Sequence, residues 1–428
     1  MKALAIVIAL LAMSIGIIGS SGQVSSSGSS GPASSFGAIG SLGPDSSFGS
    51  SGPQDSLAKR LREAWTAAAD AMVKLQVEDG SWKAGPPGKE QASLAYTGLV
   101  TAALAGAPDD VKAPYKDAIA RACRFIAAKQ NSDGSFGEGP TGAFLKTYAT
   151  GLCMMALGGA DRDKHRDALG NARGYLKANQ LKEGPDRGGL GYGDLDPKPE
   201  GIKKMEANLS TLGFAAEGMK AAGLNADDKE FWAMCAEYVK KCQNNSEVNT
   251  DKEFLARLKE KGLSVGDDGG LYYSANPDKQ QSEKIKMGDK ETIASYGAMT
   301  YDGIKTYLYA GLGKDSPEVK AAVNWVRKNY TVDVHPGFPT DDKKRELQGI
   351  FYYYLMMVRA LDAFGESPFQ TMDGKKHDWA SEVAEKLLKI RKENKLWVND
   401  NPRWWENDPV LVTMYVLNTA NVLMKHVK

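Results

Sequence analysis

The sequence predicts an all-helical protein in which six helix-pair repeats form two concentric rings. Three observations predict this fold: a turn motif that recurs along the chain, a small-residue-rich apolar helix after each turn, and a charged, amphipathic helix before it. One helix pair cannot bury its apolar face alone, so neighbouring pairs must stack. Six pairs allow the stack to close on itself.

The turn motif is a string of the form Gln-x-x-Asp-Gly-Ser-aromatic. It has two complete copies. The first contains Gln76, Asp79, Gly80 and Trp82, and the second contains Gln130, Asp133, Gly134 and Phe136. Weaker copies follow Gln180 and Gln243, and Tyr330 and Lys392 occupy the Gln position in the fifth and sixth repeats. A Gln amide can satisfy unpaired groups at a helix end, and an aromatic ring can cover it.

The helix after each turn is apolar nearly all round and contains a glycine. These glycines are Gly98, Gly151, Gly213, Gly303 and Gly349. A glycine inside a helix costs about 1 kcal/mol relative to alanine, so its return in five helices indicates close backbone packing. A helix that is apolar on all sides is buried, which predicts that these helices form the inner ring. The charged first helices then form the outer ring.

The amino terminus is typical of an exported protein. Residues 1–22 combine Lys2, an apolar run over 3–18 and a small-residue stretch over 19–22, which predicts a signal peptide. An uncleaved anchor is the alternative. Residues 23–56 form a Ser/Gly/Pro-rich linker, and residues 57–428 carry the repeats. We therefore expect a periplasmic, cell-surface or secreted protein with no transmembrane helix after signal cleavage.

Composition excludes several function classes. Lys plus Arg number 54 and Asp plus Glu number 53, so no basic field for nucleic acid is expected. The four histidines lack metal-ligand spacing, and neither a metal nor a cofactor is predicted. The four cysteines form no Cys-x-x-Cys pair. A disulfide between Cys123 and Cys153 is possible, and four buried free thiols are the alternative.

The complete turn motifs resemble the repeated QW motif of squalene-hopene and oxidosqualene cyclases. The alternation of the motif with small-residue helices is similar to the repeat of protein prenyltransferase β-subunits. The resemblance spans residues 57–428 and implies an α6/α6 toroid. It also implies that the motif residues tie each outer helix to the next one.

The catalytic motifs of that superfamily are missing. The sequence has no Asp-x-Asp-Asp acid cluster, no Asp-x-Cys zinc pair and no Asp-Asp-x-x-Asp string. The candidate catalytic acids are therefore Asp302, in the fourth inner helix, and the pair Asp341 and Asp342, ahead of the fifth. Each also has a structural interpretation: Asp302 can pair with Lys305, and the other two can face a helix dipole.

The resemblance implies that the starts of the inner helices line a central cavity. The aromatic and acidic residues at these positions are Tyr96, Tyr148, Glu206, Tyr296, Tyr301, Tyr352, Tyr353, Trp404, Trp405 and Glu406. Aromatic walls suit an apolar ligand, a cation or the faces of sugars. The competing interpretation is that these side chains simply fill the centre of the ring.

The leading functional hypothesis is an exported toroid that binds an apolar or isoprenoid-like ligand, or an envelope partner, in its centre without catalysis. A first alternative is an enzyme of the terpene cyclase or prenyltransferase class with a non-standard acid at Asp302, Asp341 or Asp342. A second is a carbohydrate-active α/α barrel, which needs a pair of carboxyl groups. Glu206 and Glu406 are the candidates for that pair.

Overall fold

The computed structural model describes residues 55–85, 88, 90–137, 145–193, 207–223 and 226–428. The predicted signal peptide, almost all of the predicted linker and Glu206 lie outside these residues. A search of the described helices found none with the length and apolar character needed to cross a membrane.

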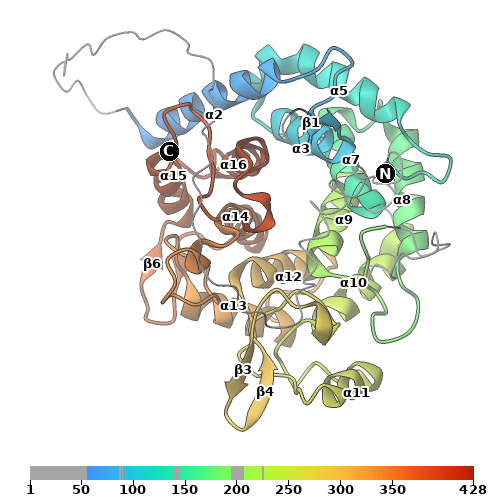
Figure 1. The fold of residues 1–428 in the computed structure, drawn as a ribbon, viewed down its shortest axis with the longest axis vertical. Coiled ribbons are helices and arrows are strands. Elements are labelled where there is room, and N and C mark those ends of the chain that lie inside the picture. Colours follow the sequence, from blue (N-terminus) through green and yellow to red (C-terminus); the bar gives the residue numbers. More distant parts are fainter. Residues whose placement is uncertain (1–54, 86–87, 89, 138–144, 194–206, 224–225) are drawn as a thin grey trace, which may run out of the picture.

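Twelve helices of the described chain form two concentric rings (Figure 1). The outer ring contains α2 (Leu57–Lys74), α5 (Lys116–Ala128), α8 (Arg166–Asn179), α10 (Lys229–Lys241), α13 (Pro317–Asn329) and α15 (Trp379–Lys389). The inner ring contains α3 (Leu94–Ala105), α7 (Lys146–Asp161), α9 (Leu209–Ala221), α12 (Gly297–Tyr309), α14 (Ile350–Phe364) and α16 (Pro409–Leu423). Because α3 packs against both α7 and α16, the inner ring is closed. The prediction of an all-α toroid of six helix pairs is confirmed.

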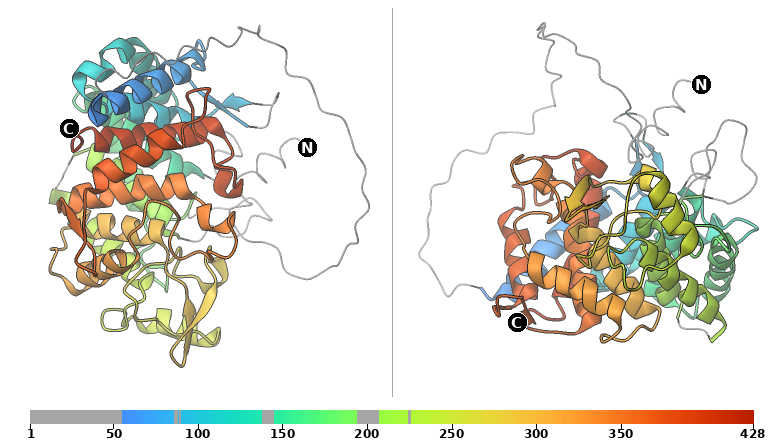
Figure 2. Two further views of the ribbon diagram at one scale, coloured as in Figure 1. Left: turned by 90° about the vertical axis from the view of Figure 1, so that its left-hand side faces the viewer. Right: turned by 90° about the horizontal axis from the view of Figure 1, so that it is seen from below.

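The described chain also contains short strands and short helices besides the helices of the two rings. Three antiparallel hairpins pair β1 (Lys83–Ala84) with β2 (Gln91–Ala92), β3 (Lys284–Met287) with β4 (Lys290–Ile293), and β5 (Phe369–Gln370) with β6 (Lys376–His377). The short helices are α4 (Asp109–Lys112), η1 (Ala113–Tyr115), η3 (Ala226–Asp228), α11 (Lys252–Glu260), η4 (Pro277–Lys279), η5 (Arg345–Leu347) and η6 (Arg403–Trp405). The β3–β4 hairpin and α11 project from one side of the toroid (Figures 1 and 2).

The two kinds of helix differ in how much of their surface they bury. Outer helix α5 buries one stripe that includes Ala122 and Ile126, and it exposes charged residues on its other face. Inner helix α3 buries nearly every residue from Leu94 to Ala105. Its first turn is fixed by Ser93, whose side chain accepts a hydrogen bond from the Tyr96 amide. The all-round apolar pattern thus assigns the inner ring correctly.

Each complete turn motif bonds to the next outer helix. The side-chain amide of Gln76 donates to the carbonyl oxygens of Gly80 (3.0 Å) and of Ala118 in α5 (2.9 Å). Gln130, Gln180 and Gln243 make the same two kinds of bond, the second of them to α8, α10 and α13. In the fifth repeat the Tyr330 hydroxyl instead donates to Glu382 of α15 (2.9 Å).

The motif glycine lets two repeats approach closely. Gly80 has φ of 92°, and a Cβ atom there would lie 2.5 Å from the carbonyl oxygen of Arg121 in α5. Of the five glycines predicted to make close contacts in the inner ring, Gly98 and Gly151 meet neighbouring backbone, and Gly213 meets the Asp302 side chain. Gly303 meets a leucine side chain instead. Gly349 is not inside a helix, because it caps the start of α14 with φ of 65°.

Side-chain amides close the ring between its last and first repeats. Asn418 of α16 donates to the carbonyl oxygen of Leu99 (3.2 Å), and Asn421 donates to that of Ala103 (2.7 Å). Both carbonyls belong to α3, so the two helices that are most distant in sequence lie side by side. No disulfide contributes, since all four cysteines are buried free thiols, and the pairing considered for Cys123 and Cys153 is wrong.

Candidate functional site

The inner helices run parallel, so their first turns meet at one end of the ring. Gly98 of α3 lies against Cys153 of α7, and Gly151 of α7 lies against Phe214 of α9. Two helical turns further on, Gly158 of α7 lies against Ala221 of α9, so these two helices run in the same direction. We call the end where the inner helices begin the amino-terminal mouth. Side chains from the first two turns of the inner helices gather there.

Four aromatic side chains form a layer just inside the mouth. They are Tyr148 of α7, Phe214 of α9, Tyr352 of α14 and Tyr415 of α16, and we call them the aromatic layer. Ring centroids lie 4.9 Å apart for Tyr148 and Phe214, 6.1 Å for Phe214 and Tyr352, and 5.8 Å for Tyr352 and Tyr415. Helices α9 and α14 are not neighbours in the ring, so the layer reaches across its interior.

Solvent reaches part of the aromatic layer from the mouth. Tyr148 and Tyr352 are half-buried, whereas Tyr415 is 7% and Phe214 1% exposed. Burial nevertheless raises the pKa of the Tyr148 and Tyr352 hydroxyls well above 10, so both are neutral at physiological pH. The layer therefore offers uncharged, partly accessible ring surfaces.

Tyrosine hydroxyls around the layer have partners within the protein. The Tyr352 hydroxyl donates to the carboxylate of Asp302 (3.4 Å), and the hydroxyls of Tyr192 and Tyr273 lie 2.6 Å apart. The hydroxyls of Tyr148 and Tyr415 also interact with each other. These bonds leave ring faces as the surfaces that a ligand would contact.

The predicted Trp404 and Trp405 lie at the edge of the mouth in a strained turn. Both are half-buried and have positive φ, at 54° and 66°, a conformation that costs a non-glycine residue about 1 kcal/mol or more. The Trp404 ring stacks on Tyr296 at 6.5 Å and donates its indole N–H to Gln281 (3.2 Å). A Cβ atom on Gly349 would lie 2.4 Å from this ring. Trp404 is thus wedged over the start of α14.

Two of the predicted cavity residues lie elsewhere. Tyr301 and Tyr353 are 1% and 0% exposed, and their rings lie 5.7 Å apart. The Tyr353 hydroxyl donates to the carbonyl oxygen of Thr331, in the loop that follows outer helix α13. The Tyr352–Tyr354 run therefore divides: Tyr352 faces the ring interior, and the other two pack between the rings.

A buried group of opposite charges lies beyond the aromatic layer. It consists of Glu217 of α9, Asp302 and Lys305 of α12, and Arg359 of α14, and we call it the charged layer. The Lys305 ammonium lies 2.8 Å from Asp302 and 3.2 Å from Glu217, and Arg359 lies 3.4 Å from Glu217. Lys305 is 0% and Asp302 1% exposed.

The pKa values of the two acids of the charged layer are shifted in opposite directions. Burial raises the pKa of Asp302 above its ordinary value, although Lys305 opposes the shift. Burial acts in the same direction on Glu217, but Arg359 and Lys305 outweigh it and lower the pKa of that carboxyl. The Asp302–Lys305 pairing that the sequence suggested is present, and it engages the acid that a cyclase-like reaction would require.

Two further acids at the mouth hold helix ends. Glu406 is fully buried, and its carboxylate accepts from the Tyr352 amide (2.8 Å) and from the Asn399 side chain (2.8 Å). It caps α14, whose own cap residue is a glycine, and burial raises its pKa to about 7. Asp408 caps α16 and accepts a hydrogen bond from the Tyr96 hydroxyl (2.6 Å).

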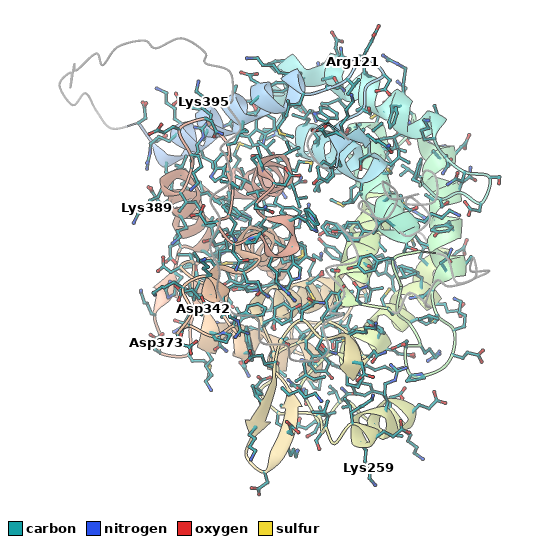
Figure 3. All side chains as sticks on the ribbon, in the orientation of Figure 1. Arg121, Lys259, Asp342, Asp373, Lys389 and Lys395 are labelled. Atoms are coloured by element: carbon teal, nitrogen blue, oxygen red, sulfur yellow. The ribbon has the colours of Figure 1, made fainter. Side chains whose placement is uncertain are left out.

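The predicted acids Asp341 and Asp342 are not in the ring interior. Both are exposed, and Figure 3 shows Asp342 to one side of the ring centre. The Asp342 carboxylate accepts from the amides of Lys344 (2.8 Å) and Arg345 (3.3 Å), at the start of η5. This is the helix-terminal role that the sequence offered as the alternative.

Several residues of the two layers were not among the site residues predicted from the sequence. Phe214 and Tyr415 lie deeper in their helices than the positions that the resemblance indicated. Glu217 and Arg359 carried a usable signal, because a charged residue in an otherwise apolar helix needs a buried partner. Among the described residues, no group of three or more potential metal ligands occurs.

Comparison with known proteins supports the fold alone. No protein-family model and no curated protein matches the sequence. A structure of the type II terpene cyclase MstE from Scytonema, in complex with merosterolic acid A as product, has a TM-score of 0.55 at 14% identity and covers 87% of this chain and 99% of its own. The same enzyme with its substrate, geranylgeranyl dihydroxybenzoate, has a TM-score of 0.53 at 14% identity, with the same coverage.

Carbohydrate-active toroids are also similar. A family 76 glycoside hydrolase (mannosidase) from Bacteroides thetaiotaomicron has a TM-score of 0.52 at 12% identity, covering 84% of this chain and 98% of its own. A heparin-specific unsaturated glucuronyl hydrolase has a TM-score of 0.53 at 12% identity, covering 86% and 96%. The chain therefore has the α/α-toroid fold that terpene cyclases and these glycosidases share. The resemblance to squalene-hopene cyclases is supported at the level of the fold.

Proposed function

We propose that this chain is an exported toroid that binds an apolar, isoprenoid-like molecule at its amino-terminal mouth without transforming it. The observation that carries the proposal is the aromatic layer. Its rings come from four inner helices, two of them remain accessible to solvent, and its hydroxyls bond within the protein. Such a surface gains from contact with hydrocarbon and offers few free donors to a polar ligand.

The toroid's structural neighbours are compatible with this proposal. One of them, MstE, has geranylgeranyl dihydroxybenzoate as its substrate, which supports an isoprenoid-like ligand for this toroid. Export is inferred from the amino-terminal sequence. An envelope partner could share the same mouth, since hydrophobic groups of a protein would meet the same surface.

The enzyme alternatives require a carboxyl group that is available for chemistry. A cyclase needs an acid that can release a proton, and a glycosidase needs two carboxyl groups. Asp302 is engaged by Lys305, while Glu406 and Asp408 hold helix ends. These engagements favour binding over catalysis.

Dye displacement tests the proposal. Full-length protein is loaded with N-phenyl-1-naphthylamine, whose fluorescence rises in apolar surroundings, and geranylgeraniol or mannotriose is then added. We expect geranylgeraniol to displace the dye and mannotriose to leave it bound. Replacing both half-buried rings, as Tyr148→Ala/Tyr352→Ala, should weaken geranylgeraniol binding by about tenfold or more.

A matched control removes a tyrosine from the opposite end of the inner ring. Tyr309 is a half-buried residue at the carboxyl end of α12, so Tyr309→Ala should bind geranylgeraniol as the wild type does. Displacement by mannotriose, or an equal loss in both variants, would contradict the proposed site.

A further inference from the structure

We propose that Asp302 and Lys305 form the closed floor of the amino-terminal mouth and limit the length of the apolar chain that it accepts. The inference rests on the proposed function of the aromatic layer. It assigns the buried ion pair a role in ligand selection, because the pair lies where a chain entering the ring would end.

The order of side chains along the inner helices places the floor. On α14, Arg359 follows Tyr352 by two turns, about 10 Å along the axis at 1.5 Å per residue. On α9, Glu217 follows Phe214 by about one turn. Since the inner helices are parallel, Glu217 and Arg359 lie beyond the aromatic layer. Asp302, which accepts a hydrogen bond from the Tyr352 hydroxyl, lies at the boundary between the two layers.

Exposure changes in the same order. Solvent reaches Tyr148 and Tyr352 from the mouth. Asp302 is 1% and Lys305 0% exposed. At the carboxyl end of the inner helices, Lys220 is exposed and Tyr309 is half-buried. Asp302 and Lys305 thus form a buried level between partly accessible residues near the starts of the inner helices and partly accessible residues near their ends.

The contacts of the charged layer join several helices. Besides Asp302 on its own helix, Lys305 contacts Glu217 of α9 and the sulfur of Met356 in α14 (3.7 Å). Arg359 continues the contacts to Glu217 and to the Asn418 side chain of α16 (3.3 Å). Charges from α9, α12 and α14, with an amide from α16, therefore meet inside the ring. A hydrocarbon chain could pass only by displacing a paired charge, which is costly.

Occupied volume, rather than charge itself, sets the position of the floor. Asn and Met have nearly the shapes of Asp and Lys, so Asp302→Asn/Lys305→Met removes the charges and keeps the obstruction. Replacing a buried ion pair by neutral residues of similar volume is often tolerated. Asp302→Ala/Lys305→Ala is also neutral, but it removes the obstruction. The two double variants therefore separate volume from charge.

The test measures how binding depends on chain length. Linear alcohols from octan-1-ol to octadecan-1-ol displace N-phenyl-1-naphthylamine from the full-length chain. In the wild type, affinity should rise about fourfold per methylene group until the chain reaches the floor and should then level off. The Ala/Ala variant should move this limit to longer alcohols, and the Asn/Met variant should keep it in place.

Two outcomes would overturn the inference. Affinity that rises through octadecan-1-ol without levelling in the wild type would show that no floor exists. An unchanged limit in the folded Ala/Ala variant would show that these residues do not form it. Should that variant not fold, Met356→Ala leaves both charges paired and must shift the limit in the same direction by a smaller step. If no alcohol displaces the dye at any length, the proposed function itself fails.

Discussion

Glu406 illustrates how a buried acid at the mouth serves the fold. It supplies the cap that Gly349 cannot provide, because glycine has no side chain to accept from the first amides of α14. The sequence placed Glu406 among the cavity residues because it stands near the start of an inner helix. Its partner helix begins more than fifty residues earlier in the chain, so the capping role depends on the folded ring.

The burial of Glu406 predicts an unusual pH dependence of stability, although its capping hydrogen bonds oppose the shift in pKa. Burial raises the pKa of Glu406 from 4.5 to about 7, so the folded protein takes up a proton more readily than the unfolded chain. Its contribution to stability is fully present below pH 4.5 and is lost as the pH rises through 7. Measured by urea unfolding, the free energy of unfolding of the wild type relative to Glu406→Gln should fall over this window by up to about 3 kcal/mol. A difference that stays constant with pH would refute the assigned burial.

At the residue scale, sequence predicted partners that are close along the chain and missed those that are distant. Asp302 and Lys305 are one turn apart on a helix, so their pairing followed from helix geometry. The partnership of Glu217 with Arg359 joins α9 and α14 and depends on the closed ring. Asp341 and Asp342 looked like an acid cluster, but they lie on an exposed turn.

At the scale of elements, the turn motif should be worth measurable stability. Gln130→Ala removes the hydrogen bonds to the carbonyl oxygens of Gly134 and Ala168 and with them the link to α8. We expect the free energy of unfolding to fall by about 1–3 kcal/mol in urea denaturation. The Gln370 side chain makes one hydrogen bond, to the carbonyl oxygen of Gly374 in its own exposed β5–β6 hairpin. Gln370→Ala is therefore the matched control and should change stability by less than about 0.5 kcal/mol. Equal effects would mean that the motif does not link the repeats.

Close packing of the inner ring predicts opposite effects for two glycines of α7. A Cβ atom on Gly151 would lie 2.6 Å from the carbonyl oxygen of Phe214, so Gly151→Ala must push α7 and α9 apart. On Gly159, which is exposed, the nearest atom would be 3.8 Å away. Thermal unfolding should show destabilisation by about 1–3 kcal/mol for Gly151→Ala and stabilisation by up to about 1 kcal/mol for Gly159→Ala. A shift of the midpoint in the same direction by both substitutions would contradict close packing of α7 against α9 at Gly151.

Elements that follow the repeat were predictable from the sequence, whereas exceptions to the repeat were not. The turn motifs that begin at Gln76 and Gln130 predict the turns, and the apolar patterns that follow them predict the inner ring. Gly349 resembled a fifth inner-helix glycine, yet it stands one residue before α14 because the chain turns there through a left-handed conformation. Tyr330 occupies the Gln position and reaches the next outer helix with a hydroxyl, a substitution that the sequence located without indicating its bond.

At the scale of the whole molecule, the number of repeats indicated a closed ring, but the content of its interior did not follow. Contacts across the ring, such as that of Phe214 with Tyr352, join helices that are adjacent neither in the chain nor around the ring. Periodicity identifies the buried face of a helix, but it does not say which residues of two such faces meet. The division of the interior into an accessible aromatic layer and a sealed charged layer therefore required the structure.

Photolabelling can locate an apolar chain bound on the aromatic layer. A geranylgeraniol analogue with a diazirine at the end of its chain is bound to the full-length protein and irradiated, and labelled peptides are identified by mass spectrometry. We expect labels in the first halves of α7, α14 and α16 and near Asp302 of α12, all suppressed by excess geranylgeraniol. Labels confined to outer helices, or labelling that geranylgeraniol does not suppress, would contradict a ligand site inside the ring.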